Sequence, residues 1–322
     1  MEKLPLELPD LRLALVGFSP AEQTVLEMAL SKVRAGLRWK QSAVADADAM
    51  FASGPRAVAL SSGLIQIGAG MPGVKPVLLD MQDSNRPLAF SLPFSVPSVA
   101  LGPTFDVRKA ESIRALLLQF TGWLRPMAVN YWLGSRIVHE RLDLSETVYH
   151  VSIDGRLQAV VSRRNGVGVL PIADPARLAD AVWARRPGPA DEIPAHFVQT
   201  PLTEVLWRYA MRSPRNLLPS YFRSGPIYWC RSPLLPQRLF RDSHLMIVRE
   251  LAHCPTSFSE LGRRTGLADA VLARDLAALR FAGAVSHDRK QALHSTVRHG
   301  GKAAHPAQQD KTAPAPLTPQ GA

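Results

Sequence analysis

Two dipeptides near the middle of the chain, Asp154-Gly155 and Asn165-Gly166, constrain its fold more than any other feature. Asp-Gly and Asn-Gly readily adopt the positive φ angles that tight hairpin turns require. They separate three segments of strand-type composition, which cover residues 147–153, 156–162 and 167–171. Alternate side chains of the first segment are apolar and share one face of the strand: Tyr149, Val151 and Ile153. We therefore predict a three-stranded antiparallel meander here.

The sequence around the meander predicts an α+β domain over residues 128–240. Two helices are expected, at 174–183 and 200–211. Each starts with a capping residue followed by proline, which suits the first turn of a helix because an N–H at that position has no intrahelical partner. A proline-rich linker is expected over 185–199, and a loop crowded with Pro, Tyr and Trp over 213–237.

The first 125 residues alternate between strand and helix signals. The run LRLALVG, residues 11–17, is almost wholly apolar, as is typical of a buried parallel strand. Ser19 then caps a helix with Pro20 in its first position, and residues 106–124 give an amphipathic helix pattern. Four further strands are expected, at 37–44, 49–52, 76–79 and 88–93. The segment 55–73 is left open, either as a third helix or in part as the third strand.

Five short strands with a leading and a closing helix resemble the receiver domain of bacterial response regulators, over about residues 10–125. A working receiver needs carboxylates after its first strand to hold Mg²⁺ and an aspartate at the end of its third strand to accept the phosphoryl group. It also needs a lysine before a proline at the end of its fifth strand, to hold the product.

This sequence lacks those groups at the positions that the resemblance aligns. Gly-Phe-Ser follows the first strand at 17–19, Ala-Ser-Gly ends the third at 52–54, and Leu92-Pro93 stands in place of Lys-Pro. Asp46 and Asp48 lie at the opposite end of the third strand. We therefore predict a degenerate, or pseudo-, receiver that is not phosphorylated and serves in docking or dimerisation. An unrelated small α/β domain is the alternative.

Three helices and a short strand are expected over residues 241–289. The first helix, 242–254, places apolar side chains at helical spacing: Leu245, Val248 and Leu251. Ser257 and Glu260 satisfy each other's free backbone donors in a capping box that begins the second helix. Gly266 ends that helix.

The third helix, 268–282, ends at Gly283, where extended Ala284-Val285 follows. Its inward stripe is apolar: Val271, Leu272, Leu276 and Leu279. The run SFSELGRRTGLADAVLARDLAALRFAGAV resembles bacterial winged-helix domains, in which a Glu-Leu helix, a glycine turn, a second helix and a terminal Gly-Ala-Val recur in this order. The resemblance implies a module that binds DNA or a protein.

The side chains expected to face outward from this module leave both partners open. Four arginines supply charge for phosphate contacts: Arg263, Arg264, Arg274 and Arg280. Arg289 and Lys290 are expected to extend them into a wing. The third helix also directs small or acidic side chains outward, which favour close packing on a protein instead: Asp269, Ala270, Ala273 and Ala277.

A second basic group lies in the loop before this module, where arginines alternate with aromatic residues. Four of its side chains could stack on a nucleotide base and hold a phosphate: Arg215, Arg223, Trp229 and Arg231. A loop of this composition can equally fold over a core.

Other motifs give no enzymatic prediction. Gly68–Gly73 matches G-x-G-x-x-G, but a strand follows it rather than precedes it, so a turn is expected. Cys230 and Cys254 form no C-x-x-C pair and are expected to be two buried, reduced thiols. The histidines do not show the spacing of metal ligands, and the sequence has neither a P-loop nor a nucleophile elbow. We therefore predict no metal, cofactor or catalytic residue.

Composition sets the class of protein. The 322 residues are 46% hydrophobic, which suits two or three folded domains. The formal charge of +11 favours a polyanionic partner, although an arginine-rich soluble surface gives the same balance. Residues 290–322 show no apolar periodicity and are expected to be a disordered tail. The sequence has no signal peptide or membrane-span pattern, so we expect a cytoplasmic protein with no membrane partner.

The fold class expected is therefore multidomain α/β plus α+β. A receiver-like parallel sheet over 1–127 precedes the meander domain over 128–240, and a winged-helix-like domain over 241–289 precedes the tail over 290–322. The leading hypothesis is a non-catalytic bacterial signalling protein that acts on a regulatory protein partner, with homodimerisation left open. A DNA-binding transcriptional regulator is the main alternative, and a cyclic-dinucleotide sensor is the second.

Overall fold

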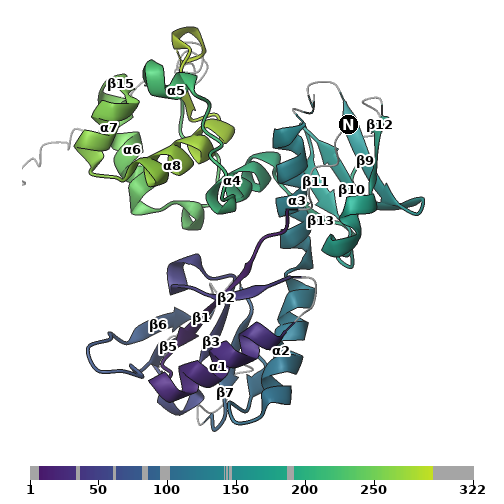
Figure 1. Cartoon of the computed structure of the whole chain (residues 1–322), viewed down its shortest axis with the longest axis vertical. Helices are drawn as coiled ribbons and strands as arrows, with labels where there is room; N and C mark the ends of the chain where they lie inside the picture. The colour runs from purple at the N-terminus through teal and green to yellow at the C-terminus, as the bar shows by residue number, and fades with distance from the viewer. Residues whose placement is uncertain are drawn as a thin grey trace, which may run out of the picture. The chain divides into compact units, whose positions relative to one another are not determined.

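The computed structural model describes residues 7–33, 37–60, 63–81, 86–94, 102–140, 142, 144, 147–186 and 192–292 of a mixed α/β protein (Figure 1). Its backbone contacts form two compact units. The first unit is Met1–Leu217 with Ala273–Ala282, and the second is Leu218–Leu272 with Gly283–Ala322. The four-part division of the sequence stays a prediction.

The first unit contains a five-stranded parallel sheet in the order β2-β1-β3-β7-β8. Its strands are β1 (Leu11–Val16), β2 (Trp39–Gln41), β3 (Ala49–Ala52), β7 (Leu88–Ser91) and β8 (Thr104–Phe105). This order is that of flavodoxin-like doubly wound sheets, in which the chain first winds to one side of β1 and then to the other. We call the end where these strands begin the amino edge and the end where they finish the carboxyl edge.

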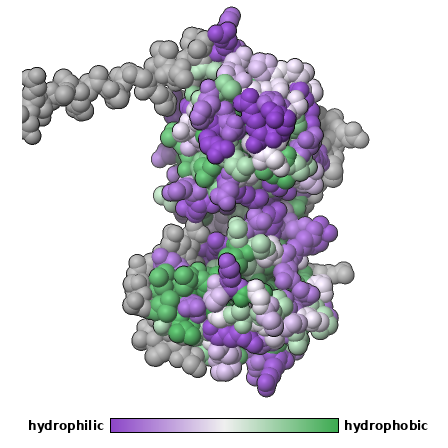
Figure 2. All heavy atoms as spheres, turned by 90° about the vertical axis from the view of Figure 1, so that its left-hand side faces the viewer, coloured by the Kyte–Doolittle hydropathy of each residue, from purple (hydrophilic) through white to green (hydrophobic). Residues whose placement is uncertain are grey.

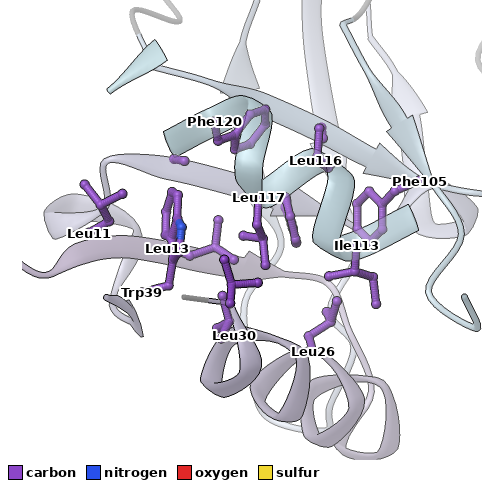
Figure 3. Packing of buried hydrophobic residues seen from close by; sticks show 14 of the residues in the cluster. Leu11, Leu13, Leu26, Leu30, Trp39, Phe105, Ile113, Leu116, Leu117 and Phe120 are labelled. Atoms are coloured by element: carbon purple, nitrogen blue, oxygen red, sulfur yellow. The ribbon is translucent and has the colours of Figure 1, made fainter. Parts of the chain in front are cut away.

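Two helices, α1 (Pro20–Lys32) and α2 (Ala110–Trp123), cover one face of this sheet (Figure 1). Alternation along β1 turns Leu11 and Leu13 toward them. Figure 3 shows these side chains meeting Leu26 of α1 and Leu117 of α2 in one core. The predicted cap at Ser19 and the amphipathic pattern of the closing helix are both confirmed.

A three-stranded antiparallel sheet covers the other face. It consists of β4 (Ala57–Ala59), β5 (Leu64–Ile67) and β6 (Val77–Asp80). Ile65, Ile67 and Leu79 pack from it against β1, β3 and β7. The open segment 55–73 is therefore neither a third helix nor the third parallel strand. The predicted strand at 76–79 is real, but its assignment to the parallel sheet was wrong.

The outer face of this small sheet carries exposed apolar side chains. Val58 of β4 and Leu78 of β6 are 58% and 60% exposed, and both pair in register with Gln66 of β5. Figure 2 looks from the side on which β5 and β6 lie in Figure 1, and it shows hydrophobic side chains gathered on the lower part of the molecule.

The predicted meander is confirmed as β9 (Val148–Ile153), β10 (Arg156–Ser162) and β11 (Gly166–Val169). Asp154 and Gly155 both take positive φ in the first turn. In the second turn only Gly166 does so, because a three-residue loop precedes it.

Two further strands extend the meander to the order β12-β9-β10-β11-β13. They are β12 (Val182–Arg186) and β13 (Val198–Thr200). The helix predicted over 174–183 is therefore only the 3₁₀ turn η4 (Pro175–Asp180), and the linker predicted over 185–199 contains parts of both strands. Alternating Trp183 and Arg185 pair with β9, so strand pairing overrides the local helix signal.

Two helices, α3 (Arg125–His139) and α4 (Leu202–Arg212), contribute to the core on one face of the extended sheet. Tyr149, Val151 and Ile153 share that face, as predicted. Gly134 permits the close approach of α4, because a Cβ there would lie 2.9 Å from the Cβ of Tyr209.

The second unit holds β14 (Pro226–Trp229) between β15 (Thr256–Ser257) and β16 (Val285–Ser286). The loop predicted over 213–237 thus contains a strand and the short helix α5 (Tyr221–Ser224). The three predicted helices are α6 (Asp242–His253), α7 (Phe258–Thr265) and α8 (Asp269–Phe281). Residues of α8 fall in both compact units. Other 3₁₀ turns among the described residues are η1 (Val44–Asp46), η2 (Gly54–Arg56) and η6 (Gln237–Leu239).

The buried stripe of α6 differs from the predicted one. Leu251 is buried, but Leu245 is 56% exposed and Val248 is half-buried. His244 and Ile247 complete the buried face instead. Within the described part of the chain, no helix is long and apolar enough to cross a bilayer.

Candidate functional site

Flavodoxin-like sheets bind ligands at the carboxyl edge. In this chain Arg56, at the end of η2, lies at that edge. Its Nη1 donates to the carbonyl oxygen of Gly17 at 2.8 Å, to Glu22 Oε2 at 3.2 Å and to Ser53 Oγ at 3.2 Å. The ends of β1 and β3 are therefore tied together by a cation of the chain itself.

Glu22 contacts Arg56 at this edge, and one of its two carboxylate oxygens, Oε2, makes several contacts. It accepts from the backbone N–H and the hydroxyl of Ser19, at 2.8 and 2.7 Å, within a complete capping box. Partial burial raises the pKa of Glu22, but hydrogen bonds from Ser19 and Arg56 outweigh it and hold the pKa below its usual value. This carboxylate stabilises the start of α1, and its Oε2 is shared between Ser19 and Arg56.

Two glycines at the carboxyl edge allow close backbone contacts. A Cβ on Gly54 would lie 1.9 Å from the carbonyl oxygen of Ser91, and a Cβ on Gly70 would lie 2.1 Å from that of Phe18. Gly54 N–H also donates to Ser91 Oγ at 3.1 Å. The Gly68–Gly73 motif forms the expected turn, and its second glycine packs against the end of β1.

The alignment of the fifth strand was wrong. Leu92-Pro93 follows β7, the fourth parallel strand in sequence order, because β6 belongs to the other sheet. The fifth strand is β8, and Asp106 follows it directly. Lys109 comes three residues later and pairs with that aspartate at 3.7 Å.

The arginines predicted for the C-terminal interface have internal partners. Arg263 and Arg264 both bind Glu260: Arg263 at 2.8 and 2.6 Å, Arg264 at 2.7 Å. These two hydrogen-bonded guanidinium groups lower the pKa of Glu260 to about 2. Only half of the predicted capping box forms, because Glu260 N–H donates to Ser257 Oγ while the Glu260 carboxylate turns to the arginines.

The predicted outward face of α8 was wrong in part. Ala273 and Ala277 are 4% and 1% exposed, so they do not form an accessible small-residue face. Arg274 Nε lies 3.1 Å from Oδ1 of the buried Asp275, and the Arg280 guanidinium lies 5.4 Å from the ring of Phe281.

The wing predicted at Arg289 and Lys290 was also wrong. Both belong to the helical residues 289–292 that follow β16. The strand beside β16 is β14, which precedes the three helices in sequence. Of the predicted tail, residues 293–322 lie outside the described part of the chain.

The four residues predicted to bind a nucleotide each contact a different part of the protein. Arg215 Nε lies 3.5 Å from Glu7 in the first unit. In the second unit, Arg223 lies 4.5 Å above the ring of Phe258, Trp229 pairs with Val285 along β14, and Arg231 lies against Gly283. Each side chain has its own protein neighbour.

The amino edge of the parallel sheet holds a site that sequence reasoning missed. Asp48, placed just before β3, forms an ion pair with Arg212 at the end of α4, and its second oxygen accepts from Arg12 N–H at 2.9 Å. The two charged side chains are 7% and 12% exposed. Asp48 thus holds α4 at the start of the sheet. The only sequence signal for it was an aspartate at the beginning of a strand, the end opposite to a phosphoryl-accepting aspartate.

Glu7, just before β1, joins a second polar network on α3 and α4. It accepts from Tyr131 at 3.0 Å, Ser135 at 3.2 Å and Tyr209 at 3.4 Å. Burial raises the pKa of both tyrosines, and the negative charge of Glu7 raises them further. His139 Nε2 lies 2.7 Å from the Tyr209 hydroxyl, and burial, then nearby Arg215, lower its pKa.

No family model matches the chain, and neither the curated proteins nor the solved structures contain a significant match to it. What the chain can do must therefore be inferred from the geometry of the two edges and of the second unit.

Proposed function

We propose that the chain is a non-catalytic bacterial regulatory protein whose pseudo-receiver and winged-helix-type module act through protein contacts. The observation that carries this proposal is the Arg56–Glu22 pair at the carboxyl edge. A phosphoryl-accepting site needs free carboxylates to hold Mg²⁺ and take the phosphoryl group. Here a guanidinium and a capped carboxylate occupy that neighbourhood.

The strand order supports a receiver ancestry for this domain. The parallel sheet follows the flavodoxin-like order, and its first and last helices share one face. The antiparallel sheet on the other face is a departure, and it leaves Val58 and Leu78 exposed. Exposed apolar side chains gathered on one face are typical of an interaction surface.

Protein contact is favoured over DNA by the state of the arginines. Arg263 and Arg264 share one carboxylate, which reduces the charge that they offer to phosphate. A DNA-binding regulator remains the second candidate, because both side chains are surface-placed and the chain carries a charge of +11.

The experiment is partner capture on the full chain with nuclease treatment. We expect captured proteins to survive nuclease and to disappear with the double variant Val58→Lys/Leu78→Lys. The matched control is Met28→Lys, since Met28 is 51% exposed on α1. Partners that disappear with nuclease would favour the DNA candidate instead.

A gel-shift titration tests the DNA candidate directly. The test variant replaces four arginines with Ala: Arg263, Arg264, Arg274 and Arg280. The slope of the logarithm of the binding constant against the logarithm of salt concentration should become shallower by ~1 for each phosphate contact that is lost. We expect the wild-type chain to bind random duplex only weakly and in low salt. Tight, sequence-selective binding at physiological salt would overturn the adaptor proposal.

A further inference from the structure

A cavity of about 190 Å³ opens at the amino edge, between β1, β2 and the end of α4. Three cationic side chains line it, Arg12, Lys40 and Arg212, against one carboxylate, Asp10. Gln41 adds a neutral amide. The cations come from three separate elements of the first unit, so the fold itself gathers them.

Strand pairing explains why two of these charges are neighbours. Arg12 of β1 lies in register with Lys40 of β2, so both side chains leave the same face of the sheet. Like charges placed side by side repel each other. Asp10 compensates in part, since its carboxylate lies 2.6 Å from Lys40 Nζ and 3.1 Å from Arg38 Nε.

The third cation reaches the cavity from a different element. Arg212 ends α4 and is held by Asp48, whose second oxygen accepts from the Arg12 N–H. One ion pair therefore sets the position of Arg212 beside the cavity. An anion in the cavity would contact β1, β2 and α4 together.

We propose that this cavity binds a phosphate group, as inorganic phosphate or as a small phosphate monoester. Guanidinium groups match phosphate oxygens with paired N–H donors, and the lysine ammonium adds a point charge. The volume is below the ~300–1,000 Å³ of pockets for drug-sized ligands, so the ligand is small. A bound phosphate would share the Arg212 guanidinium with Asp48. Phosphate binding would therefore regulate the strength of the Arg212–Asp48 contact that holds α4 at the amino edge.

Isothermal titration of the full chain with inorganic phosphate, at constant ionic strength set by chloride, tests this site. We expect saturable binding that Lys40→Gln weakens about tenfold, as expected for one charge-assisted hydrogen bond. Lys40 is 59% exposed, so the variant should fold. The matched control is Arg38→Gln, which removes the other partner of Asp10 but does not line the cavity.

A parallel titration with glycerol phosphate separates the two sources. Tighter binding than inorganic phosphate assigns the monoester, and equal or weaker binding assigns the free anion. No saturable binding, or an equal loss in Lys40→Gln and Arg38→Gln, would overturn the proposal. The titration uses no partner protein, so its failure leaves the adaptor role standing, and failure of partner capture leaves phosphate binding standing.

Discussion

The two edges of the parallel sheet differ in what fills them. At the carboxyl edge, Arg56 and the backbone around Gly54 and Gly70 occupy the space where such sheets bind ligands. At the amino edge, a cavity lies beside the partly buried Asp48–Arg212 pair. The charged side chains at the carboxyl edge contact the ends of the strands, whereas those at the amino edge line a cavity, where a residue of α4 reaches the sheet.

The largest effect is expected at the amino edge from Asp48→Asn. Removing one partner of a fully buried ion pair leaves the other charge uncompensated and costs about 3–5 kcal/mol, so this partly buried pair should lose about 3 kcal/mol. Arg212, only 12% exposed, would be left in this position. Urea unfolding measures the loss. The control Asp154→Asn breaks an exposed pair with Arg177 and should cost below about 1 kcal/mol. Equal losses of unfolding free energy in the two variants would show that Asp48 does not hold α4 at the amino edge.

At the carboxyl edge, Gly54→Ala should destabilise the chain by about 1–3 kcal/mol, because the new methyl group overlaps the Ser91 carbonyl oxygen. The matched control is Gly122→Ala in α2, where a Cβ meets nothing within 4 Å. That variant should stabilise the helix by up to about 1 kcal/mol. A neutral Gly54→Ala, measured by the shift in thermal midpoint, would mean that the edge is loosely packed.

The sequence predicted the local elements better than their pairing. The meander and the first and last helices of the parallel sheet carry their own turn, cap and amphipathic signals. Residues 76–79 read as a strand, but nothing local tells a strand of one sheet from a strand of the other. Likewise, β12 was missed: its first two residues fell in the predicted helix and its last two in the predicted linker, and its partner β9 lies about 30 residues earlier in the chain.

A smaller effect is expected from Arg56→Gln. The pair with Glu22 is about one-third exposed on both sides, so its loss should cost about 1 kcal/mol or less. The pKa of Glu22 should rise toward its usual value, although the bonds from Ser19 remain. Carboxyl NMR titration checks this. An unchanged pKa would show that the arginine does not compensate the carboxylate.

The smallest effect concerns pH at the amino edge. The pKa of His139 is lowered in the fold, so the unfolded chain binds more protons below about pH 6.5. Stability should therefore be full above that pH and fall as pH drops toward the folded pKa. His139→Gln should flatten this dependence below about pH 6.5 while keeping a polar partner for Tyr209. If the stability of the variant depends on pH as that of the wild type does, a group other than His139 causes the pH dependence.

The candidate sites show what sequence patterns cannot supply. The absence of carboxylates after β1 and β3 was readable from residues 17–19 and 52–54, but the presence of Arg56 there was not. Asp48 and Arg212 are separated by 164 positions in the chain, and only the fold joins them. The predicted face of α8 failed because a helical pattern gives a period and not the number of sides that are buried.

Incubation of the full chain with acetyl phosphate and Mg²⁺, followed by intact mass spectrometry, tests most directly the claim that the carboxyl edge is structural. We expect no covalent phosphoryl adduct, because Glu22 is capped by Ser19 and paired with Arg56, and because Ser53 and Gly54 follow the third strand where an aspartate would be needed. A response-regulator receiver treated in parallel should gain one phosphoryl group. A stable single adduct on this chain, mapped to the carboxyl edge, would contradict the account.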